Sequence, residues 1–161
     1  MNEVTKLNWA DIEDCCIKLC NKIQVSGYNV ETVICVQRGG CIPGVIISHL
    51  LNVKEFYAVG IRTTTSEAIK SIRYKQPILH IPDTLKNIER KNVLIVDDVT
   101  NTGNTLKYAK REILKYNPNQ CLTAALIWDG DNSEECLADL YAQYSPFWVV
   151  FPWETVSNQE K

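Results

Sequence analysis

Short runs of consecutive apolar residues, many of them β-branched, recur along the chain. They alternate with longer segments in which apolar residues are spaced as on one face of a helix. Such runs predict strands that are buried on both faces of a sheet. We expect strands over residues 32–36, 55–61, 77–81, 93–96 and 122–128.

Helical spacing of apolar residues predicts helices over residues 7–23, 42–51 and 106–116. Asn8 is the expected N-cap of the first helix, and Asp11 has the right charge for its first turn. Three other segments are less regular: a mobile loop or hairpin at 62–76, a charged connection at 85–92, and a short helix or irregular segment at 136–141. The alternation of strands and helices predicts an α/β fold, with a mostly parallel twisted sheet flanked by helices.

Composition narrows the classes of function. A length of 161 residues fits a single domain, and a net charge of -2 gives no bulk attraction to nucleic acid or to a membrane. No stretch is long and apolar enough to span a bilayer, and the first residues do not resemble a signal peptide, so a cytoplasmic protein is expected. The seven cysteines form no C-x-x-C pair and are expected to be reduced thiols rather than a zinc site.

The most informative stretch is the apolar run at 93–96, which is followed by Asp97 and Asp98, a loop of Thr, Asn and Gly, and a helical pattern. A helix N-terminus attracts anions, and Gly103 allows the backbone to approach a phosphate closely. The two carboxylates suit the hydroxyls of a sugar or a hydrated Mg²⁺. The segment therefore fits a sugar phosphate, while an ordinary connection with Asp98 and Thr102 as capping or turn residues remains the alternative.

A second strand–loop–helix unit carries Gln37, Arg38, Gly39 and Gly40 in its loop. Two glycines let backbone N–H groups converge on an anion, and the guanidinium adds charge. The alternative is a tight turn with a surface arginine. Because the carboxyl ends of parallel strands meet at one edge of a sheet, both loops are expected there, as a substrate with phosphate groups at two ends would require.

The segment at 147–154 is the most aromatic in the chain. It fits a C-terminal strand that fills the core. The flanking prolines and Glu154 favour instead a shaped edge on which an indole stacks against a flat heterocycle.

Residues 97–105 resemble the phosphoribosyl-pyrophosphate (PRPP) motif of type I phosphoribosyltransferases. The Arg-Gly-Gly loop followed by Ile-Pro, and the closing Trp-x-x-x-Pro-Trp-acid pattern, are similar to the short bacterial and archaeal 6-oxopurine members of that family. The resemblance extends over nearly the whole chain. It implies one domain over residues 1–161, with a lid loop at about 62–77 and a base-binding hood at about 129–157.

The resemblance also implies an activity. It is the Mg²⁺-dependent transfer of the phosphoribosyl group from PRPP to guanine, hypoxanthine or xanthine, which yields a nucleoside 5′-monophosphate and pyrophosphate. Family members are usually dimers or tetramers, so a homo-oligomer is expected, and no nucleic acid partner is. A cis peptide is implied between Gln37 and Arg38.

The same resemblance assigns roles to residues of this chain. Asp97, Asp98 and Asn101 would be catalytic, with Asp98 and Glu154 at the metal. The 5′-phosphate would be held by Thr100, Asn101, Thr102, Gly103, Asn104 and Thr105, and the pyrophosphate by Gln37, Arg38 and Gly39. The base would be held by Trp128, Trp148, Val149 and Glu154.

Two residues depart from the pattern of the subgroup. Asn101 stands where an aspartate is usual, and an amide cannot accept a proton as a base. Trp128 stands where a lysine usually reads the 6-oxo group. Two alternatives therefore stay open: a PRPP- or nucleotide-binding regulatory protein on the same fold, or a transferase for another nucleobase. A dinucleotide-binding fold is disfavoured, because no G-x-G-x-x-G follows a predicted strand.

Overall fold

A computed structural model describes residues 3–64, 73–130, 136 and 138–154 of the chain. Its centre is a sheet with the strand order β4-β3-β2-β5-β6-β7. All neighbouring strands in this sheet are parallel except β3 and β4, which are antiparallel. The strands are β2 (Thr32–Gln37), β3 (Glu55–Thr64), β4 (Arg73–His80), β5 (Asn92–Thr100), β6 (Gln120–Trp128) and β7 (Leu140–Tyr144).

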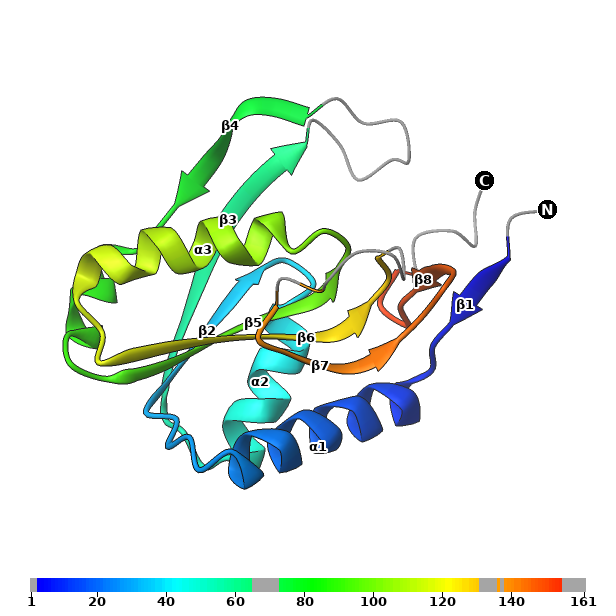
Figure 1. The fold of residues 1–161 in the computed structure, drawn as a ribbon, viewed down its shortest axis with the longest axis horizontal. Coiled ribbons are helices and arrows are strands. Elements are labelled where there is room, and N and C mark those ends of the chain that lie inside the picture. Colours follow the sequence, from blue (N-terminus) through cyan, green and yellow to red (C-terminus); the bar gives the residue numbers. More distant parts are fainter. Residues whose placement is uncertain (1–2, 65–72, 131–135, 137, 155–161) are drawn as a thin grey trace.

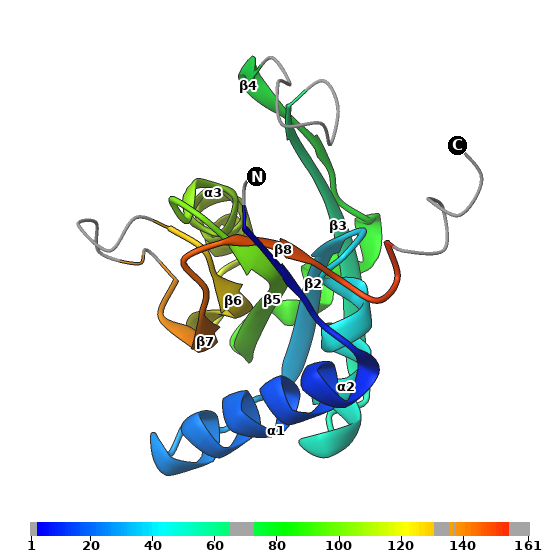
Figure 2. The same cartoon turned by 90° about the vertical axis from the view of Figure 1, so that its right-hand side faces the viewer.

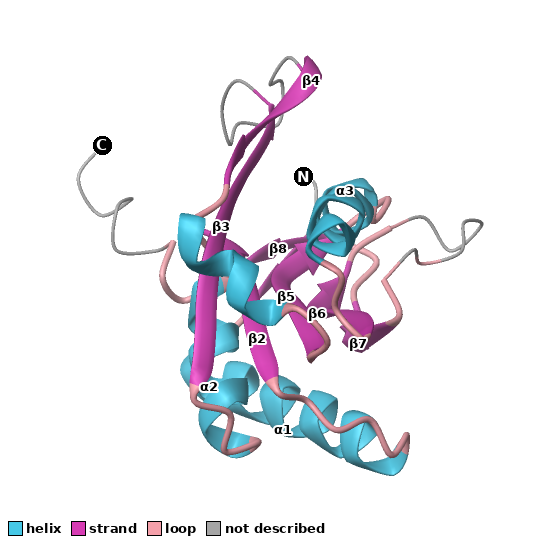
Figure 3. Cartoon of the chain, turned by 90° about the vertical axis from the view of Figure 1, so that its left-hand side faces the viewer, coloured by secondary structure: helices cyan, strands magenta, loops and turns pink. Residues whose placement is uncertain are grey.

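Helices cover both faces of the sheet, as the alternating pattern predicts (Figure 1). The helices α1 (Trp9–Val25) and α2 (Cys41–Leu50) lie on one face, and α3 (Asn104–Ile113) lies on the other (Figure 3). Each face has its own core, because successive side chains of a strand point to opposite faces. Val33, Leu94 and Val96 pack with α1 and α2, whereas Ile34 and Ile95 pack with α3.

The first helix begins as its sequence predicts. The Asn8 side chain accepts hydrogen bonds from the backbone N–H groups of Ala10 (2.8 Å) and Asp11 (3.1 Å). The Asp11 carboxylate accepts in return from the Asn8 N–H at 2.8 Å. This reciprocal arrangement is a capping box, which satisfies donors that the first helical turn leaves unpaired. Among the described residues, no helix is both long enough and apolar enough to cross a membrane.

A second, two-stranded sheet joins the two ends of the chain. The strand β1 (Val4–Lys6) pairs in parallel with β8 (Trp148–Val150), and the Thr5 and Ser145 hydroxyls lie 3.0 Å apart. Figure 2 shows this pair crossing the end of the main sheet. The first strand was not predicted, and the strand expected over 147–154 is confined to β8.

Three other sequence predictions need correction. The segment at 136–141 was expected to be a short helix or irregular: Cys136, Ala138 and Asp139 are irregular, but Leu140 and Tyr141 begin β7, a strand of the main sheet. The third helix ends at Ile113 and continues as the 3₁₀ helix η2 (Leu114–Tyr116). The charged connection contains a further 3₁₀ helix, η1 (Asp83–Ile88).

The strands β3 and β4 extend into the segment expected to be a loop or hairpin and form its two arms. The tip of the predicted lid, residues 65–72, lies outside the described residues. Residues 131–135, 137 and 155–157 of the predicted hood also lie outside them.

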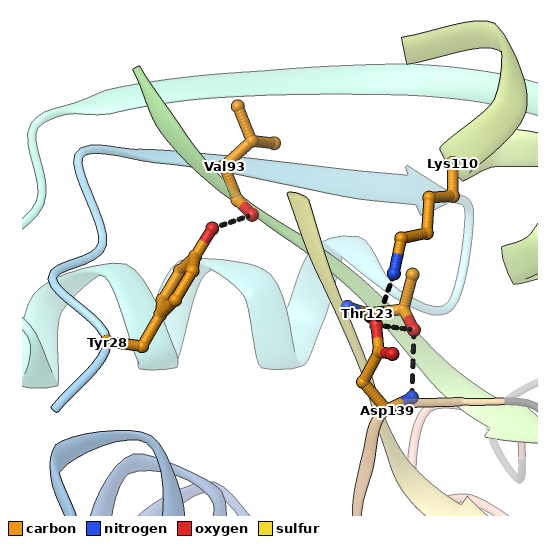
Figure 4. Close-up of polar contacts among 5 residues, drawn as sticks. All are labelled: Tyr28, Val93, Lys110, Thr123 and Asp139. Carbon is orange, nitrogen blue, oxygen red and sulfur yellow. Dashed lines mark hydrogen bonds and ion pairs between the residues drawn. The ribbon is translucent and has the colours of Figure 1, made fainter. Parts of the chain in front are cut away.

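A polar cluster holds β7 against its neighbours (Figure 4). One oxygen of Asp139 accepts from the Thr123 N–H, from the Thr123 hydroxyl and from the Lys110 ammonium, each at 2.8 Å. The Asp139 N–H donates to the Thr123 hydroxyl at 2.9 Å. These bonds tie the start of β7 to β6 and to α3.

Candidate active site

Two adjacent carboxylates lie near the carboxyl end of β5, the centre of the sheet. Asp97 is 8% exposed and Asp98 is half-buried. The Asp97 carboxylate accepts from the Asp98 N–H at 3.0 Å, and the Asp98 carboxylate accepts from the Val99 N–H at 2.8 Å. Pairing with β6 includes Asp97 and Val99, whereas pairing with β2 ends at Val96, just before the acid pair.

Burial, together with the charge of Asp98, holds the pKa of Asp97 well above its ordinary value. Burial also raises the pKa of Asp98, to which the nearby charge of Glu154 adds. Two carboxylates that repel each other in a poorly solvated place favour a proton or a cation between them.

Among the described residues, no cluster of three or more His, Cys, Asp or Glu side chains forms a protein-only metal cage. Mg²⁺ needs no such cage, since it usually binds through one or two carboxylates, several waters and the phosphates of a substrate. The acid pair therefore fits a Mg²⁺ ion that arrives with a phosphorylated substrate.

The loop after β5 ends at Gly103, which has a φ of 74° and forms the N-cap of α3. A left-handed φ is readily adopted by glycine and is costly for other residues. Within the described part of the chain, no side chain caps this helix by a hydrogen bond. Its first N–H groups therefore remain available to an anion. Thr100 is buried, whereas Thr102 and Thr105 are half-buried, and Asn101 and Asn104 are exposed.

Residues 37–40, which we call the 37–40 loop, connect β2 to α2. The peptide bond between Gln37 and Arg38 is cis, as the resemblance implied. The loop lies directly against the acid pair. A Cβ atom built on Gly39 would lie 1.6 Å from an oxygen of Asp98, and one on Gly40 would lie 2.7 Å from the carbonyl oxygens of Val36 and Val96. Only glycine allows this close approach.

Both loops follow strands at the same end of the sheet (Figure 1). The N-terminus of α2 also has no side-chain cap among the described residues. Its first N–H groups are nevertheless occupied, because those of Cys41 and Ile42 donate to the carbonyls of Arg38 and Gly39 and Pro43 has no N–H. The acid pair is therefore flanked by the N-terminus of α3, which suits one phosphate group, and by the 37–40 loop, whose Arg38 suits a second. The strand β8 lies at this same end (Figure 1).

The two residues that depart from the subgroup contact each other. The indole N–H of Trp128 donates to the backbone carbonyl of Asn101 at 3.1 Å. The Asn101 side-chain amide donates to the carbonyl oxygen of Asp129 at 3.1 Å and to its carboxylate at 3.4 Å. The Trp128 ring also packs against Tyr141 and Tyr144, with centroids 5.4 and 5.0 Å away. The indole N–H is thus bonded to the loop rather than directed at a ligand.

Sequence reasoning missed two neighbours of this contact. Burial raises the pKa of Asp129, against the effect of its hydrogen bond from Asn101. A Cβ atom on Gly130 would lie 2.3 Å from the indole nitrogen of Trp128 and 2.8 Å from the carbonyl of Asn101. The sequence signal for these two residues was the Asp-Gly pair directly after the strand that ends at Trp128, which is typical of a tight turn.

The closing aromatic segment has two faces. Val149 and Phe151 are buried in the core, whereas Trp148 is 52% exposed. Among the described strands, β8 pairs only with β1, so the backbone along its other edge is not paired with a strand. Glu154 closes the turn after β8, since its carboxylate accepts from the Phe151 N–H at 2.9 Å. Val149 and Phe151 therefore meet the expectation of a strand that fills the core, whereas stacking of a heterocycle on Trp148 stays a prediction.

The acid pair predicts an unusual dependence of stability on pH. Because the pKa of Asp97 is raised in the folded state, its contribution to stability is largest below its ordinary value of 3.8 and is lost as the pH rises through the raised value. We expect Asp97→Asn to raise the melting temperature at pH 8 and to have less effect at pH 5. Each ~1 kcal/mol corresponds to roughly 2–4 °C in a domain of this size. Calorimetry at both pH values measures the difference.

Asp139 provides a control of opposite sign. Burial raises its pKa, but hydrogen bonds from Lys110 and Thr123 outweigh burial and lower it overall. Asp139→Asn should therefore lower the melting temperature at both pH values. An Asp97→Asn variant that melts lower than the wild type at pH 8 would contradict the inferred repulsion.

Comparison with known proteins agrees with this geometry. A family model of the phosphoribosyl transferase domain matches residues 7–159. The xanthine-guanine phosphoribosyltransferase of Idiomarina loihiensis is 22% identical over 149 residues, which cover 92% of this chain and 85% of that protein. A purine phosphoribosyltransferase structure from Pyrococcus horikoshii is 28% identical, with a TM-score of 0.75 and 94% of each chain covered. A xanthine-guanine-hypoxanthine phosphoribosyltransferase structure from Helicobacter pylori is 19% identical, with a TM-score of 0.74 and 97% of each chain covered.

These matches span nearly the whole chain and confirm the predicted fold, a mostly parallel sheet flanked by helices in the type I arrangement. The chain belongs to the phosphoribosyltransferase family.

Proposed function

We propose that this chain transfers the phosphoribosyl group of PRPP to a purine base, with Mg²⁺, and releases pyrophosphate and a nucleoside 5′-monophosphate. One observation carries the proposal. The acid pair lies near the carboxyl end of β5, beside the N-terminus of α3, which lacks a side-chain cap among the described residues, and beside the 37–40 loop that carries Arg38. PRPP has a phosphate at one end, a pyrophosphate at the other and a diol between them, so each of its polar groups meets a complementary feature.

In this proposal the 5′-phosphate binds at the N-terminus of α3, and the pyrophosphate binds at the 37–40 loop. The acid pair accepts hydrogen bonds from the ribose hydroxyls. The 5′-phosphate contacts come from Thr100, Asn101, Thr102, Gly103, Asn104 and Thr105, and the pyrophosphate contacts from Gln37, Arg38 and Gly39.

A ring nitrogen of the base displaces pyrophosphate from C1 of the ribose. Positive charge grows on the sugar ring and negative charge on the departing pyrophosphate. When bound by Asp98, with Glu154 nearby, Mg²⁺ would supply positive charge to that leaving group. Asp97 and Asp98 stabilise the ring charge, and Arg38 with the backbone of the 37–40 loop holds the pyrophosphate.

The base is proposed to lie beside β8. Trp148 offers an exposed ring on which the base can stack. One side of β8 is not paired with any described strand, so the Val149 backbone on that side can hydrogen-bond the rim of the base. Trp128 is proposed to shape the pocket through its ring, because its N–H is bonded to Asn101.

The stacking role predicts an uneven effect of Trp148→Ala. The KM for the base should rise by about tenfold, because stacking of an aromatic ring on a base contributes roughly 1–3 kcal/mol. The KM for PRPP should change by less than about twofold, because Trp148 is assigned to the base and not to PRPP. Such a change is far below the 1.4 kcal/mol of a tenfold step. Steady-state kinetics with each substrate varied in turn measures both values. Equal losses for the two substrates would mean that Trp148 only supports the fold.

A specific observation also favours a second candidate function. The contact with the Asn101 carbonyl uses the single N–H of the Trp128 indole, and the Asn101 amide cannot accept a proton as a base. A chain with an intact PRPP site and a weakened base site would serve as a PRPP- or nucleotide-binding regulatory protein, or as a transferase for another nucleobase.

The substitution Asn101→Asp tests this point. If proton removal from the purine limits the rate, the new carboxylate should raise kcat by on the order of a hundredfold, the lower end of what general base catalysis contributes. The variant Asn101→Ala is the matched control, because it removes the bond to Asp129 without adding a base. An unchanged kcat in Asn101→Asp would show that this proton transfer does not limit turnover.

The proposed activity is tested by chromatography of a reaction that contains the full chain, PRPP, Mg²⁺ and one purine base. We expect the corresponding nucleoside 5′-monophosphate to accumulate in proportion to enzyme. If no base yields a nucleotide, the transferase proposal fails and the regulatory candidate takes its place.

A further inference from the structure

Two cysteines flank the 37–40 loop. Cys35 lies in β2, and Cys41 is the first residue of α2. Their Sγ atoms are 2.9 Å apart. A disulfide bond is ~2.05 Å long, so the two sulfur atoms need to approach by less than about 1 Å to form one.

The two thiols differ in their surroundings. Cys35 is 0% exposed, and burial, followed by its contact with Cys41, raises the pKa of its thiol. Cys41 is half-buried, so a dissolved oxidant reaches it first. The helix keeps the pair together, because a Cβ atom on Gly44 would lie 2.9 Å from the Cβ of Cys35. The Cys41 N–H donates to the Arg38 carbonyl at 3.1 Å, which ties Cys41 to the loop.

We propose that Cys35 and Cys41 are an oxidation site for hydrogen peroxide, at which a reversible disulfide links the two ends of the 37–40 loop. The Cys41 sulfur attacks one peroxide oxygen, the O–O bond breaks, and a sulfenic acid and one water form. The Cys35 sulfur then attacks the Cys41 sulfur, and the hydroxyl group leaves as a second water after taking up the Cys35 proton. Two thiols thereby lose two electrons and two protons, which reduce the peroxide to water. A dithiol reductant reverses the reaction by exchange.

The link has a consequence that rests on the proposed function. A Cβ atom on Gly39 would overlap an oxygen of Asp98, so the loop and the acid pair are in contact without substrate. Pyrophosphate can lie between them only if the loop moves. A disulfide between Cys35 and Cys41 closes a short ring around the loop and restricts that movement. We expect oxidation to lower PRPP-dependent turnover by on the order of tenfold, since small misplacement of binding groups has effects of that size or larger.

The sequence makes the link easy to detect. Trypsin cleaves after Lys22, Arg38 and Lys54, so Cys35 and Cys41 fall into separate peptides, residues 23–38 and 39–54. The folded full chain is treated with hydrogen peroxide, quenched in acid, alkylated under denaturing conditions and digested. Mass spectrometry should find the two peptides joined, with two hydrogen atoms lost, and dithiothreitol should separate them.

Variants assign the effect to this pair. Cys41→Ser should abolish the link and keep its turnover after peroxide, whereas Cys121→Ser, which retains both thiols, should behave as the wild type. Absence of the linked peptides in the wild type would overturn the proposal. Linked peptides without a reversible loss of turnover would overturn the inferred effect on the loop. If the chain proves to have no transferase activity, the linked peptides and a PRPP-induced thermal shift still test the site separately.

Discussion

Asp98→Asn is expected to lower kcat/KM for PRPP by on the order of a hundredfold or more, the scale observed when a preorganised electrostatic contact is removed from an active site. Asp98 lies beside Gly39 of the 37–40 loop, and Glu154 is close enough to affect its pKa. An amide keeps the shape of the side chain but loses the charge that would hold Mg²⁺ or a ribose hydroxyl. Pyrophosphate release under saturating base measures the loss.

Asp14→Asn is a suitable control for this substitution. Asp14 is an exposed carboxylate on α1 that forms a surface ion pair with Lys18. It should leave both turnover and PRPP binding unchanged, since surface ion pairs contribute little. An Asp98→Asn enzyme with wild-type kcat/KM for PRPP would remove Asp98 from the site.

Gly40→Ala is expected to damage both the fold and the site. The new Cβ atom would lie 2.7 Å from the carbonyl oxygens of Val36 and Val96 and 2.9 Å from the Cα of Asp97. All three neighbours are backbone atoms of paired strands, which cannot rotate away as a side chain can. We expect a destabilisation of about 1–3 kcal/mol, as for other overpacked positions, together with loss of PRPP binding. Thermal unfolding with and without PRPP measures both effects.

Gly39→Ala is expected to affect turnover without a comparable loss of stability. At this position the three atoms nearest to the Cβ atom would all belong to the Asp98 carboxyl group, at distances of 1.6 to 3.0 Å. A side chain can rotate away, so this variant should stay close to wild-type stability. It should nonetheless lose turnover by on the order of a hundredfold, because the displaced carboxylate no longer faces the loop. Equal stability and equal activity in the two variants would contradict the close packing of the loop on the acid pair.

Much of the architecture follows from local sequence. The short, β-branched apolar runs around residues 33–36 and 93–96 predict strands because such runs are typical of a sheet covered on both faces. The N-cap at Asn8 and the glycine at 103 follow from the backbone chemistry of helix termini. The resemblance to phosphoribosyltransferases adds the assignment of residues to the parts of the substrate. The cis peptide bond before Arg38 agrees with that resemblance.

The features that the sequence could not supply depend on contacts between distant residues. Val4–Lys6 is a strand only because β8 provides its partner, more than a hundred residues away. Leu140–Tyr144 has no clear period, and its strand is fixed by pairing with β6. The Trp128 N–H finds the Asn101 carbonyl only after the loops beyond β5 and β6 are packed together. The close approach of Cys35 to Cys41 likewise needs the tight turn of the 37–40 loop.

Whether the chain is a purine phosphoribosyltransferase is tested by pyrophosphate release from PRPP and Mg²⁺, measured with guanine, hypoxanthine, xanthine, adenine, uracil and orotate in turn. We expect release that depends on the added base and is highest with one of the 6-oxopurines. Base-dependent release with a different nucleobase would keep the transferase and overturn the purine assignment. No release with any base, together with a PRPP-induced rise in melting temperature, would contradict the transferase and identify a PRPP-binding protein on a transferase fold.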